Sequence, residues 1–192
     1  MMRTVRLVGF LALAGCASLP APGVSTGDGS VSMAIVDVAG GAVLPYGQIA
    51  RNCEVTGGQL GREVDDNAGY KLYDSNPNAT GLRTQYITGF KDNCARQFTA
   101  ATALMGEIGT HELVRYLPSN AKVPYSVTDK AYEAVKASVC GARRGKPCGA
   151  KLDVLARSTT FITAYEQFGS NPTWSNILLY NGSVVAMGPA AP

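Results

Sequence analysis

The chain has 192 residues, of which 46% are hydrophobic and 16% are charged. This length suits a single domain with a sizeable core, and the composition excludes an intrinsically disordered acidic or basic protein. The 17 Lys and Arg residues against 14 Asp and Glu give a net charge of only +3, too small to indicate a nucleic-acid-binding protein. The five cysteines form an odd number, so one of them should differ in role from the other four.

The N-terminal residues have the pattern of an export signal. Arg3 and Arg6 supply positive charge ahead of a short apolar stretch, Leu7 to Leu13. A helix that spans a bilayer needs roughly 20 apolar residues, and this stretch is far shorter. The pattern is therefore typical of a signal peptide that is removed, and not of a transmembrane anchor.

The end of that signal, Leu13-Ala14-Gly15-Cys16, resembles the lipobox of bacterial lipoproteins. The resemblance covers this segment alone. It implies diacylglycerol on the Cys16 sulfur, cleavage after Gly15, and acylation of the new N-terminus, which together would anchor the protein in a membrane. Ala17 follows the cysteine in place of Asp, which by the sorting rule of such lipoproteins implies the outer membrane, with the protein facing the periplasm. The alternative is an ordinary signal peptide with a chance cysteine near its cleavage site.

Composition divides the chain into four segments. Residues 1–15 are the expected cleaved signal peptide. Residues 16–30 hold the lipidated cysteine and a tether rich in Pro, Gly, Ser and Ala, which predicts flexibility. Residues 31–188 form a single α+β domain, and residues 189–192 are predicted to be a disordered tail.

Hydrophobic periodicity in the domain predicts an antiparallel sheet. A β-branched stretch at 31–40 indicates the first strand, and 42–56 is a weaker candidate. Residues 69–75 and 84–90 flank a turn-rich segment and predict a β-hairpin. Residues 95–106 fit a helix or a strand, and we favour the strand. The type of 112–118 stays open. Residues 157–168 are rich in β-branched and aromatic residues and predict a strand.

The C-terminal part gives the strongest hairpin pattern. Two apolar segments, 176–180 and 183–187, flank Asn181-Gly182, and both of these residues tolerate the positive φ of a type I′ turn. Residues 157–168 should supply a third antiparallel strand beside this hairpin.

One segment, 126–141, predicts a helix more clearly than any other. Ser126 and Asp129 have the spacing of a capping box, and Gly141 follows the last apolar residue, where a helix commonly ends. Apolar residues recur every four positions and predict one buried stripe; they are Val127, Ala131, Val135 and Val139. The whole pattern predicts an α+β fold, in which an antiparallel sheet with a C-terminal β-hairpin carries one or two packed helices.

Four cysteines remain once Cys16 is assigned to lipidation. In an oxidising compartment we expect them to form two disulfides. Cys140 and Cys148 are separated by a short loop containing Gly and Pro, and loop-closure entropy favours this nearest pair, which leaves Cys53 with Cys94.

We expect no metal or other cofactor. The cysteines lack the C-x-x-C spacing of a zinc site or a redox dithiol. The D-x-N-x-N segment at 74–78 begins like a calcium loop, but Ala79 and Gln85 stand where that loop needs Gly and Glu. A turn-rich hairpin loop explains the same residues.

His111 is the only histidine of the chain, so any Ser-His or Cys-His catalysis must use it, with a carboxylate such as Glu112. A zinc-protease motif would need a second histidine where the chain has Arg115, and a G-x-S-x-G motif is absent from the sequence. We favour a structural role for His111, in a loop or at a helix start, over a catalytic one.

The loop between Cys140 and Cys148 has three cations, Arg143, Arg144 and Lys146. Closed by a disulfide, it would be a pre-organised cluster that could bind phosphates of an anionic lipid or lipopolysaccharide, or an acidic partner protein. The alternative, which we favour from sequence alone, is a solvated loop whose charges have no specific partner.

These observations lead to three hypotheses on function. The first is a non-enzymatic binding or structural module, anchored in the bacterial envelope, whose partner is an envelope protein, a lipid or a glycan. The second is a periplasmic hydrolase or cell-wall-modifying enzyme that uses His111. The third is a carrier of an apolar ligand, which would need a sizeable internal cavity.

Overall fold

The computed structural model describes residues 32–169 and 173–190. The expected signal peptide, Cys16 and the tether lie outside these residues. The described strands and helices are β1 (Ile49–Asn52), α1 (Gly57–Leu60), β2 (Arg62–Asn67), β3 (Tyr70–Asp74), β4 (Arg83–Thr88), β5 (Ala95–Ala100), β6 (Thr102–Gly106), α2 (Ile108–Arg115), α3 (Val127–Cys140), α4 (Leu152–Ala156), β7 (Thr159–Tyr165), β8 (Trp174–Tyr180) and β9 (Ser183–Pro189). No helix among the described residues is long and apolar enough to cross a membrane.

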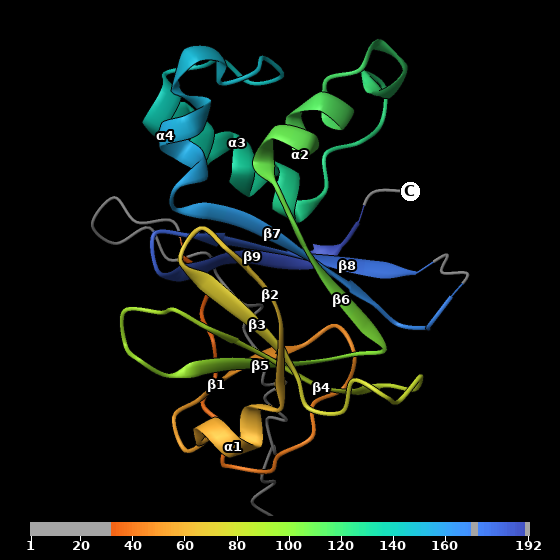
Figure 1. Cartoon of the computed structure of the whole chain (residues 1–192). Coiled ribbons are helices and arrows are strands. Elements are labelled where there is room, and N and C mark those ends of the chain that lie inside the picture. Colours follow the sequence, from red (N-terminus) through yellow and green to blue (C-terminus); the bar gives the residue numbers. More distant parts are fainter. Residues whose placement is uncertain (1–31, 170–172, 191–192) are drawn as a thin grey trace, which may run out of the picture.

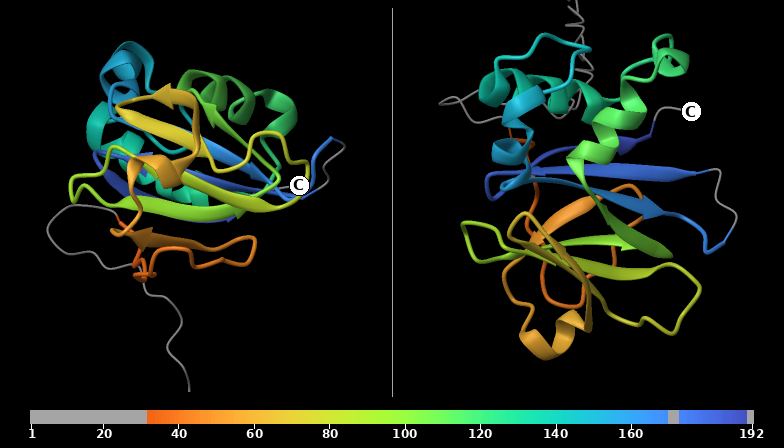
Figure 2. Two further views of the ribbon diagram at one scale, coloured as in Figure 1. Left: turned by 60° about the horizontal axis from the view of Figure 1, so that its bottom comes forward. Right: turned by 45° about the horizontal axis from the view of Figure 1, so that its top comes forward.

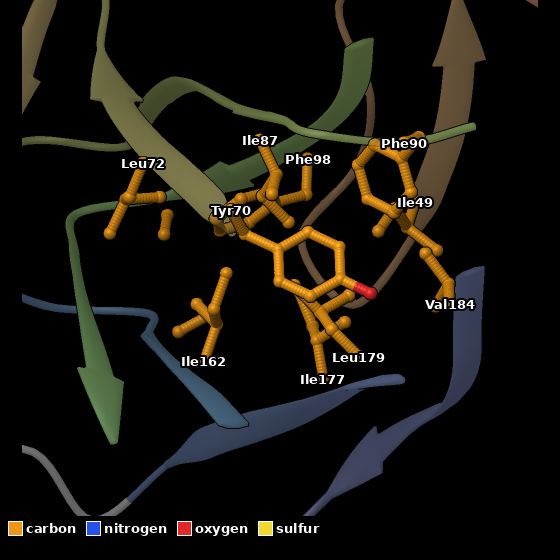
Figure 3. Close-up of a cluster of buried hydrophobic side chains, with 12 residues drawn as sticks. Ile49, Tyr70, Leu72, Ile87, Phe90, Phe98, Ile162, Ile177, Leu179 and Val184 are labelled. Atoms are coloured by element: carbon orange, nitrogen blue, oxygen red, sulfur yellow. The ribbon is translucent and has the colours of Figure 1, made fainter. Parts of the chain in front are cut away.

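The strands form two antiparallel sheets that face each other (Figure 1). One has five strands in the order β1-β5-β4-β3-β2, and the other has four in the order β6-β7-β8-β9. Apolar side chains from both sheets fill the space between them and form the first hydrophobic core (Figure 3). This core includes Tyr70, Leu72 and Phe98 from the five-stranded sheet and Ile162 and Ile177 from the four-stranded one.

The helices α2, α3 and α4 cover the other face of the four-stranded sheet (Figure 2). We call residues 107–157 the helical layer. A second hydrophobic core joins this layer to the sheet, with Ile108, Tyr132 and Leu155 packed against Phe161 and Leu178. The sheet thus buries both faces, because alternate residues of β7 and β8 point to the two cores.

The predicted α+β fold with its C-terminal β-hairpin and two disulfides is confirmed. The hairpins β3–β4 and β8–β9 are both present, and Asn181 and Gly182 have φ of 47° and 76° in the turn of the second. β7 pairs with β8 as the expected third strand. The segment 95–106 is extended, as we favoured, but it forms two strands in different sheets, since the chain passes from one sheet to the other at Ala101.

The predicted strand at 31–40 is wrong for the residues that the structure describes. Residues 36–38 run beside the edge strand β1 and make two backbone hydrogen bonds, from Val38 N to Arg51 O and from Arg51 N to Val36 O, each 2.8 Å. This pairing is too short to form a strand, and the turn at Gly40 and Gly41 ends it. The expected disordered tail also starts too early, because Pro189 belongs to β9 and Ala190 N donates to Trp174 O.

The predicted helix at 126–141 is confirmed, with Ser126 as its N-cap and Gly141 in the left-handed conformation at its C-terminal end. Its predicted apolar stripe is only partly right. Val135 is buried, but Val127 is exposed. The residues of α3 that are buried are Thr128, Asp129, Tyr132, Glu133, Val135 and Lys136. Most of the inward face of α3 is therefore polar or charged.

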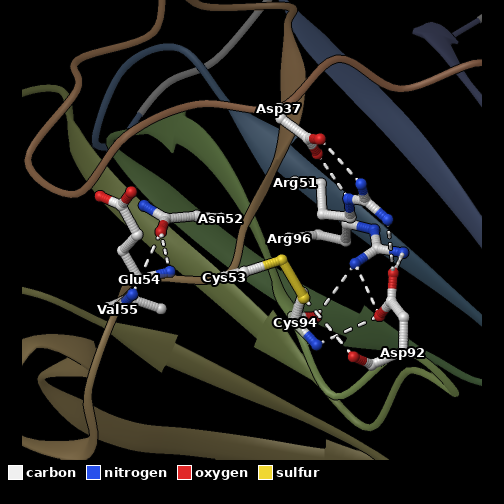
Figure 4. Close-up of a disulfide and its surroundings, with 9 residues drawn as sticks. All are labelled: Asp37, Arg51, Asn52, Cys53, Glu54, Val55, Asp92, Cys94 and Arg96. Carbon is white, nitrogen blue, oxygen red and sulfur yellow. Dashed lines mark hydrogen bonds and ion pairs between the residues drawn. A yellow bond between two sulfur atoms is a disulfide. The ribbon is translucent and has the colours of Figure 1, made fainter.

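The cysteines pair as predicted, Cys53 with Cys94 and Cys140 with Cys148. The first bridge joins the end of β1 to the start of β5 beside ion pairs that link Asp37, Arg51, Asp92 and Arg96 (Figure 4). Its sequence separation of 41 gives an entropic stabilisation of about 4 kcal/mol, against about 2.5 kcal/mol for the separation of 8 in the second bridge.

Candidate ligand pocket

A pocket of about 370 Å³ opens between the helical layer and the four-stranded sheet. Its volume lies in the range of small-ligand sites, roughly 300–1,000 Å³. Its walls combine aromatic and aliphatic side chains with several polar ones. The lining residues are Gly106, Glu107, Thr110, His111, Val114, Arg115, Asn120, Val123, Ser126, Asp129, Phe161, Thr163, Trp174, Asn176 and Ala190.

Helix α2 places His111 in the wall of this pocket. The imidazole ring stacks on Phe161 of β7, with ring centroids 4.3 Å apart, and it meets the ring of Tyr132 of α3 edge-on at 4.8 Å. Only 17% of the side chain is exposed. Two aromatic contacts therefore fix the plane of the ring.

The N-terminus of α3 brings a carboxylate to this histidine. Asp129 and Ser126 form the predicted capping box, in which Ser126 N donates to Asp129 Oδ2 and Asp129 N donates to Ser126 Oγ, both at 3.0 Å. Asp129 Oδ1 then lies 3.6 Å from His111 Nε2, and Oδ2 lies 3.6 Å from Arg115 Nε. The cap thus holds a charged group between the only histidine and a buried arginine.

The two nitrogens that face Asp129 have no hydrogen-bond partner among the described residues, although both are buried. The 3.6 Å separations are too long for hydrogen bonds, and leaving a buried polar group unpaired costs free energy. Arg115 is otherwise well held, since its Nη1 and Nη2 donate to Asn120 O and Val123 O at 2.9 and 2.8 Å. Asp129 therefore lies close to both nitrogens without forming a hydrogen bond to either.

Burial lowers the pKa of His111 to about 4, and Arg115 acts in the same direction, while Asp129 opposes both. The imidazole is consequently neutral at pH 7. A neutral histidine in a pocket can accept or donate a hydrogen bond, and it can also act as a general base.

The floor of the pocket comes from β7 and β8. Thr163 and Asn176 are paired across the two strands, and Thr163 Oγ1 donates to Asn176 Oδ1 at 3.1 Å. Trp174, the only tryptophan of the chain, lies two residues before Asn176 and therefore on the same face of the sheet. Thr163 and Asn176 thus place hydrogen-bonding side chains on the pocket side of both strands.

Behind the pocket, α2 and α3 share a buried polar network. Glu112 accepts hydrogen bonds from Tyr132 Oη at 2.9 Å and from the backbone N–H of Cys148 at 3.0 Å. Lys136 Nζ lies 2.6 Å from Glu133 Oε2 and donates to Tyr116 Oη and to Lys146 O. Burial, together with the Glu133 carboxylate, raises the pKa of Tyr116 above its ordinary value.

The structure separates two residues that the sequence suggested as partners. His111 lines the pocket, but Glu112 points away from it and bonds to Tyr132 and Cys148. The carboxylate that faces His111 is Asp129, which the sequence indicated only as a helix cap. Trp174, Asn176 and Thr163 were missed as site residues; the single tryptophan of the chain was the available signal.

The three cations of the Cys140–Cys148 loop are exposed and lie outside the pocket lining. Among the described residues, no group of three or more His, Cys, Asp or Glu side chains lies close enough to hold a metal ion. At the expected hairpin loop 74–78, Asp74 is bound to Arg83 and accepts the backbone N–H of Asn76.

Comparison with known protein families, with curated proteins and with solved structures finds no match for this chain.

Proposed function

We propose that this chain is a lipid-anchored protein of the bacterial cell envelope, facing the periplasm, and that its domain is a non-enzymatic module that binds a small envelope ligand in the pocket. The observation that carries the proposal is the pocket itself, whose lining includes Trp174, the buried His111 and the hydrogen-bonded pair Thr163 and Asn176. An aromatic wall beside hydrogen-bonding groups suits a ligand with an apolar face and polar edges, which is the chemistry of a sugar ring.

Tryptophan fluorescence tests this proposal directly, because the only tryptophan of the chain lines the pocket. We expect Trp174 emission to change saturably when the protein is titrated with soluble cell-wall fragments, such as muropeptides or N-acetylglucosamine oligosaccharides. Asn176→Ala should weaken binding about fivefold, the effect of one lost hydrogen bond. Asn78→Ala, at an exposed position of the distant β3–β4 loop, is the matched control and should leave the titration unchanged. Unaltered Trp174 emission with every fragment would contradict the proposal.

A second candidate is the hydrolase, and one observation favours it. The neutral His111 lies beside Asp129, which could orient the ring while His111 takes a proton from an attacking water. We expect the protein to bind the fragments without turning them over. Turnover that His111→Gln abolishes, while Trp174 titration persists, would replace the binding module by this enzyme.

The carrier of an apolar ligand has less support. The space between the two sheets is occupied by the first hydrophobic core, and the pocket has polar side chains in its walls. A lipid carrier would need a larger apolar cavity than these residues leave.

The anchor is tested at Cys16. Cys16→Ser should abolish incorporation of labelled fatty acid and leave the precursor uncleaved by the lipoprotein peptidase, because the thiol is the acceptor that the lipobox resemblance implies. The readouts are labelling of the protein in cells and its mobility in gels. Cys53→Ser in the same assay should still be labelled, and persistent labelling of the Cys16 variant would refute the anchor.

A further inference from the structure

Among the described residues, exposed positive charge is concentrated on the helical layer. Within residues 107–157, all described, seven cations are exposed against two carboxylates, Glu107 and Asp153. The cations are Lys122, Lys130, Arg143, Arg144, Lys146, Lys151 and Arg157. In contrast, residues 32–100, which contain the five-stranded sheet, have three exposed cations and six exposed carboxylates. The weak overall charge of the chain therefore conceals one strongly positive layer.

The asymmetry arises because the other carboxylates of this layer are buried. Glu112, Asp129 and Glu133 all point inward, where they bind backbone amides, tyrosine hydroxyls and Lys136. Within the described part of the chain, none of the seven exposed cations forms an ion pair with a carboxylate. Their charge is consequently free to act on an external partner.

A disulfide and hydrogen bonds fix the backbone of the loop that holds Arg143, Arg144 and Lys146. The disulfide closes it, the Glu133 carboxylate accepts the backbone N–H of Gly145 at 3.2 Å, and Lys136 Nζ donates to Lys146 O at 2.7 Å. A turn within the loop adds a hydrogen bond from Lys146 N to Arg143 O at 3.1 Å. The backbone is therefore ordered before any ligand binds, which reduces the entropic cost of binding.

Aromatic stacking fixes Arg144 in the same way. Its guanidinium lies 4.3 Å from the centroid of the Tyr125 ring, and the guanidinium of Arg115 lies 3.8 Å from the same centroid. Arg115 is in turn bound to the 120–123 segment. The stack joins the basic loop to the end of α2.

Exposed apolar side chains share the layer with these cations. Leu113 of α2 and Leu117, two residues past the end of that helix, are 70% and 42% exposed. Val127 and Val154 are also more than half exposed. Cations interspersed with exposed apolar residues are the pattern of surfaces that lie on anionic membranes, whereas a solely electrostatic contact with an acidic protein would not need the leucines.

From these observations we propose that the helical layer docks on an anionic membrane surface, with Arg143, Arg144 and Lys146 bound to lipid phosphates and Leu113 and Leu117 in the interfacial region. This interaction is separate from the ligand pocket and would orient the domain once the chain is anchored. Fifteen residues, 16–30, separate the proposed lipid anchor from the domain, and a chain of that length spans at most about 50 Å.

Vesicle co-sedimentation of the mature chain, residues 16–192 with Cys16→Ser, tests the proposal without an acyl anchor. We expect binding to vesicles of phosphatidylethanolamine and phosphatidylglycerol, and none to phosphatidylcholine. Each Lys or Arg near an anionic surface contributes about fivefold, so the triple variant R143Q/R144Q/K146Q should bind about 100-fold more weakly. Added salt should weaken binding of the parent protein, and L113S/L117S should lower the binding that remains at high salt.

The matched control is R62Q/K71Q/K91Q, which removes the same charge from exposed positions of the five-stranded sheet and its loops. It should bind the anionic vesicles within a few-fold of the parent protein, and both triple variants should keep its thermal unfolding midpoint. Equal losses in the two variants would show that net charge alone acts, and would overturn the docking surface. Loop-dependent binding to poly-glutamate without binding to vesicles would overturn it in favour of an acidic protein partner.

Discussion

Replacing Lys136 by methionine is expected to lower the free energy of unfolding by about 3–5 kcal/mol, the usual cost of removing one partner of a buried ion pair. The Lys136 side chain is fully buried and Glu133 is 7% exposed, so the remaining carboxylate would lie in the interior without its counter-charge. The hydroxyl of Tyr116 and the carbonyl of Lys146 would each lose a donor as well. Urea unfolding followed by circular dichroism measures the change.

Two further variants make this result specific. Lys130→Met, at an exposed position of the same helix, should change stability by no more than about 0.5 kcal/mol. The double variant Glu133→Gln/Lys136→Met should be less destabilised than the sum of its single variants, because the two residues interact. A loss below about 1 kcal/mol in Lys136→Met would mean that water reaches the pair and that it behaves like a surface salt bridge.

This network also shows what the sequence could and could not predict about α3. The capping residues Ser126 and Gly141 determine where the helix begins and ends, and these are local signals that a single sequence contains. The buried face depends on partners from elsewhere in the chain. Glu133 and Lys136 are charged and would normally be assigned to solvent, but Tyr116 and the 143–146 loop satisfy them. Such pairing becomes visible only when α2, α3 and the loop are assembled.

For the strands too, the sequence predicts the local features and misses those that depend on the assembled fold. The turn residues Asn181-Gly182 and the β-branched and aromatic content of 157–168 predict the C-terminal hairpin and its third strand correctly, because both signals are local. The segment 95–106 has continuous extended character, and nothing in its alternation indicates that β5 and β6 enter different sheets. The disulfides could be paired from sequence separation, because closing a short loop costs less conformational entropy than closing a long one.

The pocket was the least predictable part. Its residues come from α2, the α3 cap, β7 and β8, which are distant in sequence, and each has an ordinary structural explanation when considered alone. The interpretation of Asp129 as a cap was correct but incomplete, because the same carboxylate faces His111. The basic loop shows the opposite case. Its three cations were visible in the sequence, whereas the burial of the neighbouring carboxylates, which leaves them unopposed, was not.

The second large effect should come from His111 on acidification. Its pKa is about 4 in the folded protein and about 6.5 in an unfolded chain, so below pH 6.5 the unfolded state binds the proton more readily. The stability associated with a neutral His111 is therefore fully present above pH 6.5 and is lost progressively down to pH 4. By pH 5 the loss from this residue should reach about 2 kcal/mol.

Urea unfolding at pH 7 and pH 5 tests this, with His111→Phe as the comparison because phenylalanine keeps a ring against Phe161 and Tyr132 but does not titrate. Its stability should differ by less than about 0.5 kcal/mol between the two pH values. Carboxylates act in a lower window, since hydrogen bonding with Arg96 and Lys71 lowers the pKa values of Asp92 and Glu63 respectively. The contribution of these carboxylates to the free energy of unfolding is lost mainly below pH 4. In that range His111 is protonated in both the folded and the unfolded state and no longer changes the stability. An equal decline of both proteins between pH 7 and pH 5 would assign the acid sensitivity to groups outside the pocket and would show that water reaches the His111 ring.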